Sequence, residues 1–284
     1  MAPPSYPTYS LGSWVGNSTD SAGVEWYATT VEGLDDTPAA DTAQYANPAG
    51  DGTTLGPVRF PSRTIAFTGT AVAPNRYEAR AAIDRLRAAY VAARKQTTLT
   101  IHDLTGDRMA TVVPADAVKV SPVNPFAFRF QFSVLAGDPR LYDTDERVAT
   151  TAFPGAATSA SGRGFPLTFP FGFGSSAIPG DVPLLNEGTA ATFPRFRIDG
   201  PMTTATIRNN TTGLEMTLVY TLGVGEWLDI DTAARTILLN GTANRRSALQ
   251  VGSRWPTLEP GYNAIQFRGQ GTGALTVRWR SAWL

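Results

Sequence analysis

The sequence of 284 residues contains no cysteine, and its only histidine is His102. The absence of cysteine excludes a disulfide framework, a thiolate nucleophile and a cysteine-ligated zinc site. A single histidine excludes any site that needs two imidazoles from one chain. Charged residues make up 17% of the sequence, whereas an ordinary soluble domain has roughly 25%. Because the side chains that most enzymes use are scarce, we expect no catalysis, no metal and no cofactor.

An excess of charge of one sign is also missing. The 24 Lys and Arg residues are matched by 24 Asp and Glu residues, so the composition indicates no general attraction to nucleic acid or anionic lipid. No apolar run approaches the ~20 residues that a membrane-spanning helix needs. The first ten residues lack the basic and apolar segments of a secretory signal. We therefore expect no membrane insertion.

What the sequence does contain is a strong strand pattern. Apolar runs rich in Val, Thr and Phe alternate with polar residues, and Gly, Pro, Asn and Asp separate them. The clearest strand carries Phe126, Phe128, Phe130 and Phe132, and strict alternation predicts all four rings on its buried face. The sequence therefore predicts a mainly β protein.

Two segments depart from this pattern. Residues 75–95 predict the single helix, because their apolar residues repeat at helical spacing and Asn75 and Glu78 have the spacing of a capping box. Residues 34–57 are rich in Asp, Asn, Pro and Gly, and they predict a long exposed loop.

The pattern divides the chain into three parts. Residues 1–143 predict a small β-barrel or sandwich with the helix packed on it. Residues 144–181 predict a linker or extended arm, since small residues and prolines dominate there. Residues 182–284 hold a series of short strands separated by turn signals, which predicts a β-sandwich.

The search for chemistry starts at His102, beside Asp103. Adjacent residues of a strand point to opposite faces, and no Gly-x-Ser-x-Gly motif accompanies the pair. We therefore interpret His102 as a structural residue.

A pair of carboxylates is the second possibility for catalysis. Asp229 and Asp231 would share one face of a strand, as a cell-wall hydrolase acting on glycan would require. The residues after Asp231 are instead those that typically follow an Asp whose side chain caps a hairpin turn. We favour the turn role, and the spacing does not fit a calcium loop either.

Three tryptophans, Trp255, Trp279 and Trp283, offer a third possibility. Their rings could stack on sugars in a lectin-like groove, although tryptophans of a sandwich more often pack in the core or in an interface.

The order of several motifs resembles the distal tail proteins, which are minor tail proteins of long-tailed bacteriophages. The matching runs of the second half are LNEGT at 185–189, FPRFRIDG at 193–200, IRNNTTG at 207–213, LDIDT at 228–232, RTILLNG at 235–241, SRW at 253–255, LEPGYN at 258–263 and VRWRSAWL at 277–284. The motif FPLTFP at 165–170 resembles tail proteins of phages that infect actinobacteria. The first half resembles the family more loosely, through GDG at 50–52, RTI at 63–65, the helix, and a strand ending at Asp138 and Pro139.

The resemblance implies a structural virion protein at the tail tip, assembled in the host cytoplasm. Barrels of the first part would form a homo-hexameric ring, decorated by a sandwich like those of galectins or carbohydrate-binding modules. This baseplate hub would join the tail tube protein to the tail-tip, tail-associated and receptor-binding proteins, with the tape measure protein as a further candidate partner. DNA would pass through the ring transiently.

For contacts between subunits we expect the helix and the extended segments to matter. The residues predicted for this interface are Arg80, Arg87, Tyr90, Arg94, Phe165, Phe169 and Phe171. The alternative function is a carbohydrate-binding tail adhesin, in which Trp255 or Trp279 of the sandwich contacts cell-wall glycan.

Overall fold

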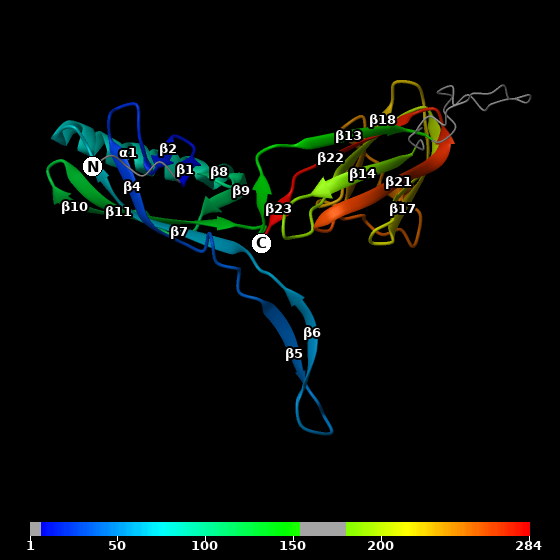
Figure 1. Ribbon diagram of the computed structural model, residues 1–284, viewed down its shortest axis with the longest axis horizontal. Coiled ribbons are helices and arrows are strands. Elements are labelled where there is room, and N and C mark those ends of the chain that lie inside the picture. Colours follow the sequence, from blue (N-terminus) through cyan, green and yellow to red (C-terminus); the bar gives the residue numbers. More distant parts are fainter. Residues whose placement is uncertain (1–6, 154–179) are drawn as a thin grey trace, which may run out of the picture. The chain divides into compact units, whose positions relative to one another are not determined.

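The structure is a computed structural model that describes residues 7–153 and 180–284. The chain forms two compact units, one of residues 1–144 with 283–284 and the other of residues 145–282. Both units are built from antiparallel strands, and the described residues contain one α-helix, α1 (Arg76–Ala92) (Figure 1). The prediction of a mainly β protein with one helix is confirmed. No helix among the described residues has the length and apolar character to cross a membrane.

The first unit is organised around one sheet with the strand order β2-β1-β8-β9-β11-β7-β4-β3. Strand β10 pairs with β11, and β12 pairs with β9 and β23. The strands are β1 (Thr8–Leu11), β2 (Trp14–Gly16), β3 (Ser18–Thr19), β4 (Glu25–Glu32), β7 (Arg63–Val72), β8 (Thr97–Asp103), β9 (Gly106–Pro114), β10 (Lys119–Asn124), β11 (Ala127–Ala136), β12 (Leu141–Asp143) and β23 (Ala282–Trp283).

The two ends of this strand order meet at a single residue. β2 and β3 lie at opposite ends of the order, yet only Asn17 separates them in the chain, so the sheet curls until its ends come together. Asn17 is buried and adopts a left-handed backbone conformation with φ 54°. Its Nδ2 donates to the carbonyl of Pro7 at 2.8 Å, and its Oδ1 accepts from the amide of Ala28 at 2.8 Å. Asn17 therefore ties the start of β1 to β4.

Aromatic rings fill the inside of the curled sheet. The buried rings of β11 are those of Phe128, Phe130 and Phe132. The centre of the Phe132 ring lies 4.9 Å from the ring centre of Trp14 and 5.1 Å from that of Phe67. The prediction of four buried rings is wrong for one of them. Phe126 precedes the strand and is 49% exposed, because the alternation that buries the others begins only at Ala127.

Helix α1 starts where its sequence predicts. The side chain of Asn75 accepts hydrogen bonds from the amides of Tyr77 and Glu78 at 3.0 and 2.9 Å, as an N-cap does. The Glu78 carboxylate, expected to return to Asn75, instead lies 3.3 Å from Arg85. A short 3-10 turn (Ala93–Lys95) extends the helix, and one apolar stripe is buried against the sheet: Ala79, Ala82, Ile83, Leu86, Ala89 and Tyr90.

Asp20 connects the turn after β3 to this helix. Its Oδ1 accepts from the amides of Ala22 and Val24 at 2.9 and 3.0 Å, and its Oδ2 accepts from Trp26 Nε1 and Arg85 Nη2, both at 3.2 Å. Burial alone would raise the pKa of the Asp20 carboxyl. The hydrogen bonds from Val24, Trp26 and Ala22 and the charge of Arg85 outweigh it, so the pKa is lowered.

This lowered pKa gives a prediction about pH. Since the unfolded carboxyl titrates near ~4, Asp20 contributes its stability above that pH and loses it as the pH falls through the lower pKa of the folded state. Asp20→Asn removes the charge and is expected to cost about 2 kcal/mol at pH 7. Urea unfolding at pH 7, 5 and 3 should show the difference from the wild type shrinking at pH 3. A difference that is constant with pH would contradict this role.

The second unit consists of two antiparallel sheets, with the orders β13-β22-β15-β18-β19-β20 and β14-β21-β16-β17. Buried side chains of both sheets form one hydrophobic core, in which the rings of Phe153 and Phe267 lie 4.2 Å apart. The strands are β13 (Arg147–Ala152), β14 (Asp181–Asn186), β15 (Arg195–Asp199), β16 (Met202–Asn209), β17 (Leu214–Leu222), β18 (Trp227–Asp231), β19 (Thr236–Leu239), β20 (Ala243–Asn244), β21 (Gly261–Gly271) and β22 (Ala274–Trp279). A 3-10 turn, η2 (Arg246–Ala248), follows β20.

The boundaries of the units differ from the predicted ones at two places. The start of the predicted linker 144–181 forms β13, which pairs with β22 from Arg147↔Trp279 to Ala152↔Ala274, because its Val and Thr residues suit a strand. At the other end, Trp283 and Leu284 belong to the first unit rather than to the predicted sandwich 182–284. There the guanidinium of Arg108 lies 4.7 Å from the centre of a Trp283 ring.

Candidate functional site

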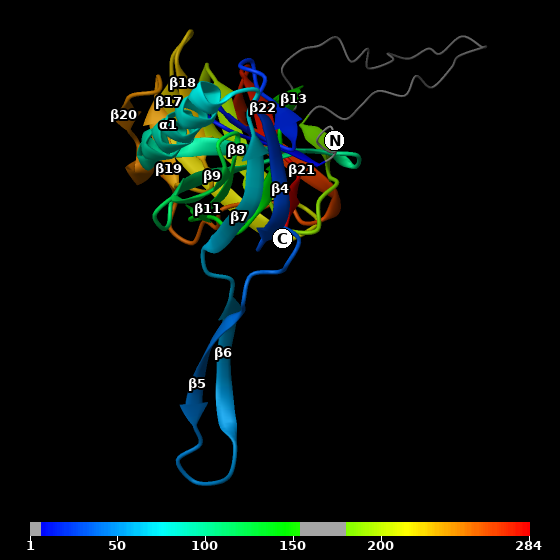
Figure 2. The ribbon, with the colours of Figure 1, turned by 90° about the vertical axis from the view of Figure 1, so that its left-hand side faces the viewer.

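A two-stranded hairpin of the first unit, β5 (Asp41–Ala46) and β6 (Thr53–Arg59), exposes several apolar side chains. We call residues 41–60 the arm. The two strands pair only with each other, and Figures 1 and 2 show the arm extending beyond the ends of β4 and β7. The prediction of an exposed segment at 34–57 is correct for most of its residues, although Leu34 is buried. Its description as a loop is wrong for residues 41–46 and 53–57, which form paired strands.

The arm carries apolar side chains into solvent. Tyr45 is 63% exposed, Leu55 64% and Val58 60%, and Phe60 at the end of the arm is also exposed. An isolated two-stranded hairpin is at best marginally stable in water, and exposed apolar groups of this kind mark surfaces that bind another protein. The free edges of β5 and β6 add unpaired backbone groups to the same surface. The arm therefore has the properties of a segment that docks on a partner.

The base of the arm is fixed by a buried arginine. Arg63 Nη1 donates to the carbonyls of Gly33, Leu34 and Asp36 at 3.1, 2.6 and 3.1 Å, and its Nε donates to Pro139 at 2.8 Å. Burial lowers the pKa of this guanidinium, and the charges of Asp36 and Asp35 oppose the shift. Arg63 thus holds the segment that leads into β5 on the body of the unit.

The predicted interface residues of α1 and of the 3-10 turn after it fall into two groups. Arg80 and Arg87 are exposed and share Asp84, at 4.0 and 3.6 Å, and Arg94 is also exposed. Exposed pairs of this kind contribute little to stability, so these arginines remain available to a partner.

Tyr90, predicted for the same interface, is buried in its own unit. Its hydroxyl donates to the carbonyl of Ser133 at 2.8 Å and also contacts the carbonyl of Asp116, and its ring lies 5.7 Å from that of Phe132. Burial raises the pKa of this hydroxyl. Tyr90 belongs to the apolar stripe of the helix, and this corrects its assignment to a surface between subunits. Phe165, Phe169 and Phe171 lie outside the described residues.

Neither Trp255 nor Trp279, the residues predicted for glycan contact, has a fully exposed ring. Trp279 is buried, and its Nε1 donates to the carbonyl of Leu185 at 2.9 Å. Trp255 is partly buried against the core of the second unit. The register of β22 points Trp279 inward, so its use as a sugar platform is wrong.

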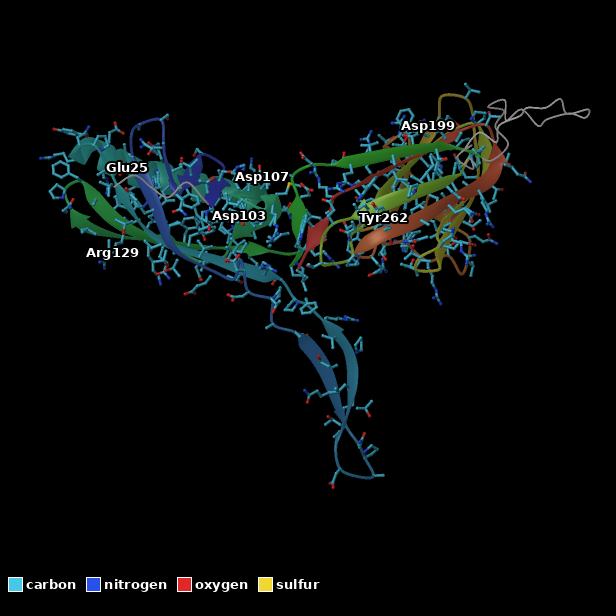
Figure 3. All side chains as sticks on the ribbon, viewed as in Figure 1. Glu25, Asp103, Asp107, Arg129, Asp199 and Tyr262 are labelled. Carbon is cyan, nitrogen blue, oxygen red and sulfur yellow. The ribbon has the colours of Figure 1, made fainter. Side chains whose placement is uncertain are left out.

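His102 forms its contact across the β8–β9 hairpin rather than with its neighbour. Its Nδ1 lies 2.8 Å from Asp107 Oδ2, which faces it in the register of the two strands. Asp103 instead accepts from the amide of Leu104 at 2.7 Å in the turn, and Figure 3 shows Asp103 and Asp107 at this hairpin. No serine hydroxyl of the described residues contacts His102 in this arrangement. Its structural role is consistent with these contacts.

Asp229 and Asp231 share one face of β18, but each carboxylate is already engaged. Asp231 Oδ1 accepts from the amide of Ala234 at 2.8 Å, and its Oδ2 lies 3.1 Å from Arg195 Nε. Asp229 Oδ2 accepts from Trp227 Nε1 at 2.9 Å. The predicted turn-capping role of Asp231 is confirmed. No group of three or more His, Cys, Asp or Glu residues in the described parts of the chain could hold a metal ion.

Both aspartates line a groove on this face of the second unit. The groove has a volume of about 350 Å³ and is lined by Arg195, Phe196, Arg197, Asp229, Ile230, Asp231, Thr236, Leu238, Gly241 and Arg278. It lies on the side of the sheet β22-β15-β18-β19 that faces away from the core, because outward and inward residues alternate along each strand. The sequence alone does not reveal it, since its residues come from four strands.

Comparison with known proteins finds a family match in the C-terminal part of the chain. Residues 187–283 match the model of the siphovirus-type tail component, C-terminal domain. This part of the chain is therefore similar to the C-terminal domain of siphovirus-type tail components. This confirms the resemblance to phage tail proteins in the part of the chain where the sequence motifs are densest, and the family consists of structural tail proteins.

Solved structures extend the comparison to the whole fold. The Dit protein of SPP1, described as a paradigm of the hub adsorption apparatus in phages that infect Gram-positive bacteria, matches with a TM-score of 0.64 and 14% identity over 90% of this chain and 93% of its own. A chain of the phage P2 baseplate in its activated conformation with Ca matches with a TM-score of 0.49 and 12% identity over 96% and 97%. A comparison with curated protein sequences finds no match. The chain thus has the fold of the SPP1 Dit protein.

Proposed function

We propose that this tail component is a structural hub protein at the distal end of a phage tail. The observation that carries the proposal is the tail-component domain at residues 187–283. The likeness of the whole fold to the SPP1 Dit protein, a hub protein by its description, supports it. We infer a non-enzymatic role, and the engagement of His102, Asp229 and Asp231 in local structure supports this inference.

In this proposal the first unit forms a closed β-barrel, and copies of it assemble into a homo-hexameric ring. The junction of β2 and β3 at Asn17 supports the closure of the barrel. The arm supports the ring, because an arm that docks on a different surface of the next copy makes a head-to-tail contact, and head-to-tail contacts form a ring when the rotation between copies closes. The exposed Arg80 and Arg87 of α1 and Arg94 of the 3-10 turn after it offer a second contact surface between subunits.

The ring would join the tail tube protein on one side to tail-tip, tail-associated and receptor-binding proteins on the other. The second unit, which we propose to be a galectin-like sandwich, would decorate the outside of the ring. DNA would pass through the lumen without lasting contacts, since phosphate binding would slow its exit. The balance of 24 positive and 24 negative residues is consistent with such a channel.

Gold-labelled antibodies raised against the purified chain test the location directly. On intact virions we expect label at the end of the tail far from the capsid. Label on the capsid, or virions that contain none of the chain, would overturn the proposal.

A further inference from the structure

In the groove of the second unit, one positively charged side chain has no negatively charged partner among the described residues. One row of side chains runs across four strands, because Arg278 of β22 faces Arg195 of β15, Arg195 faces Asp231 of β18, and Asp231 faces Thr236 of β19. Two guanidinium groups thus stand on adjacent strands at one end of the row. At the other end, carboxylate and hydroxyl oxygens line the groove.

The two arginines differ in their partners. Arg195 is paired with Asp231 at 3.1 Å. Arg278 is exposed and forms no ion pair or hydrogen bond with any residue of the described ranges. Its guanidinium therefore has five free donors in the geometry that binds a carboxylate or phosphate through two parallel hydrogen bonds.

The rest of the groove suits a ring that carries hydroxyl groups better than it suits a simple ion. Asp229 lies in the second row, between Arg197 of β15 and Leu238 of β19. One oxygen of Asp229 accepts from Trp227, which leaves acceptor capacity for hydroxyl groups. The guanidinium of Arg197 lies 4.5 Å from the centre of a Trp227 ring, and its Nε lies 2.9 Å from Asp199 Oδ1. These two contacts hold the side chain in place at one side of the groove. A volume of about 350 Å³ exceeds what a single anion needs.

We propose that this groove binds an acidic saccharide, with its anionic group on Arg278 and Arg195 and its hydroxyls on Asp229 and Thr236. A neutral sugar would leave Arg278 without its counter-charge, and a free anion would leave Asp229 and Thr236 unused. The acidic group can be a carboxylate, as in a uronic acid, or a phosphate, as in a sugar phosphate. The proposal uses residues of the second unit alone and holds whether or not the chain forms a ring.

Binding to the full chain can be measured by calorimetry with four probes. These are trigalacturonate, glucose 1-phosphate, neutral maltotriose and inorganic phosphate. We expect at least one of the two acidic saccharides to bind more tightly than both maltotriose and inorganic phosphate. Binding of trigalacturonate would identify the acidic group as a carboxylate, and binding of glucose 1-phosphate would identify it as a phosphate.

The variant R278Q removes the unpaired guanidinium from an exposed position, and it should weaken binding of the acidic saccharide about tenfold or more. The matched control is R208Q, because Arg208 is an exposed arginine of the other sheet, 3.6 Å from Glu215, and it should leave binding unchanged. Equal loss in both variants, or binding of inorganic phosphate as tight as that of the acidic saccharides, would overturn the proposal. So would an absence of binding by both acidic saccharides, or binding of maltotriose equal to theirs.

Discussion

The triple variant Tyr45→Ser, Leu55→Ser and Val58→Ser is expected to convert the assembled chain into monomers. Each of these side chains is more than half exposed in the single chain. If the arm docks on the next copy, burial of each side chain contributes roughly 1.5–3 kcal/mol. Losing all three should cost each contact about 5 kcal/mol, which weakens association more than a thousandfold. Size-exclusion chromatography with light scattering measures the mass directly.

A second triple variant controls for the loss of exposed apolar surface as such. Val224, Val251 and Tyr262 are at least as exposed as the arm residues, but they lie in the second unit (Figure 3 labels Tyr262). Their replacement by serine should leave the assembly intact. If the arm variant kept the mass of the wild type, or if both variants lost it equally, the arm would not be the ring contact.

Phe132→Ala is expected to cause the largest loss of folding stability, about 4 kcal/mol. The Phe132 ring is fully buried and lies within 6.1 Å, between ring centres, of the rings of Trp14, Phe67, Phe130 and Tyr90. Its removal leaves a cavity that these neighbours can fill only in part. Urea unfolding of the full chain, followed by tryptophan fluorescence, measures the cost.

The matched control for this prediction is Phe126→Ala. Phe126 belongs to the same alternating run in the sequence but is 49% exposed and lies outside β11. Its replacement should cost less than about 1 kcal/mol, as surface substitutions do. Similar losses for Phe126→Ala and Phe132→Ala would mean that both rings are buried to the same degree, contrary to the structure.

Local sequence signals predicted those elements that depend on neighbouring residues. The N-cap at Asn75, the buried alternation from Phe128 to Phe132, and the turn held by Asp231 each follow from a few adjacent side chains. The same signals failed where burial or strand pairing depends on residues that are far apart in the sequence. Phe126 lies past the end of the pairing between β7 and β11, whose register ends at Ala127↔Val72.

The arm was missed as a hairpin for a related reason. Its strands have no buried face, so no apolar alternation marks them in the sequence, and the Asp, Asn, Pro and Gly residues among them are typical of a loop. The groove was missed because its residues meet only through strand register, with Arg195, Asp231 and Arg278 brought together from three strands. The place of Arg80, Arg87 and Arg94 in the subunit interface remains a prediction.

We expect copies of this chain to form a ring through their arms. A cryo-electron microscopy reconstruction of the assembled tail tip tests it most directly. We expect a closed sixfold ring in which Tyr45, Leu55 and Val58 of each copy are buried against the next. A tail tip without a ring of this chain, or a ring in which the arms extend into solvent, would contradict the account.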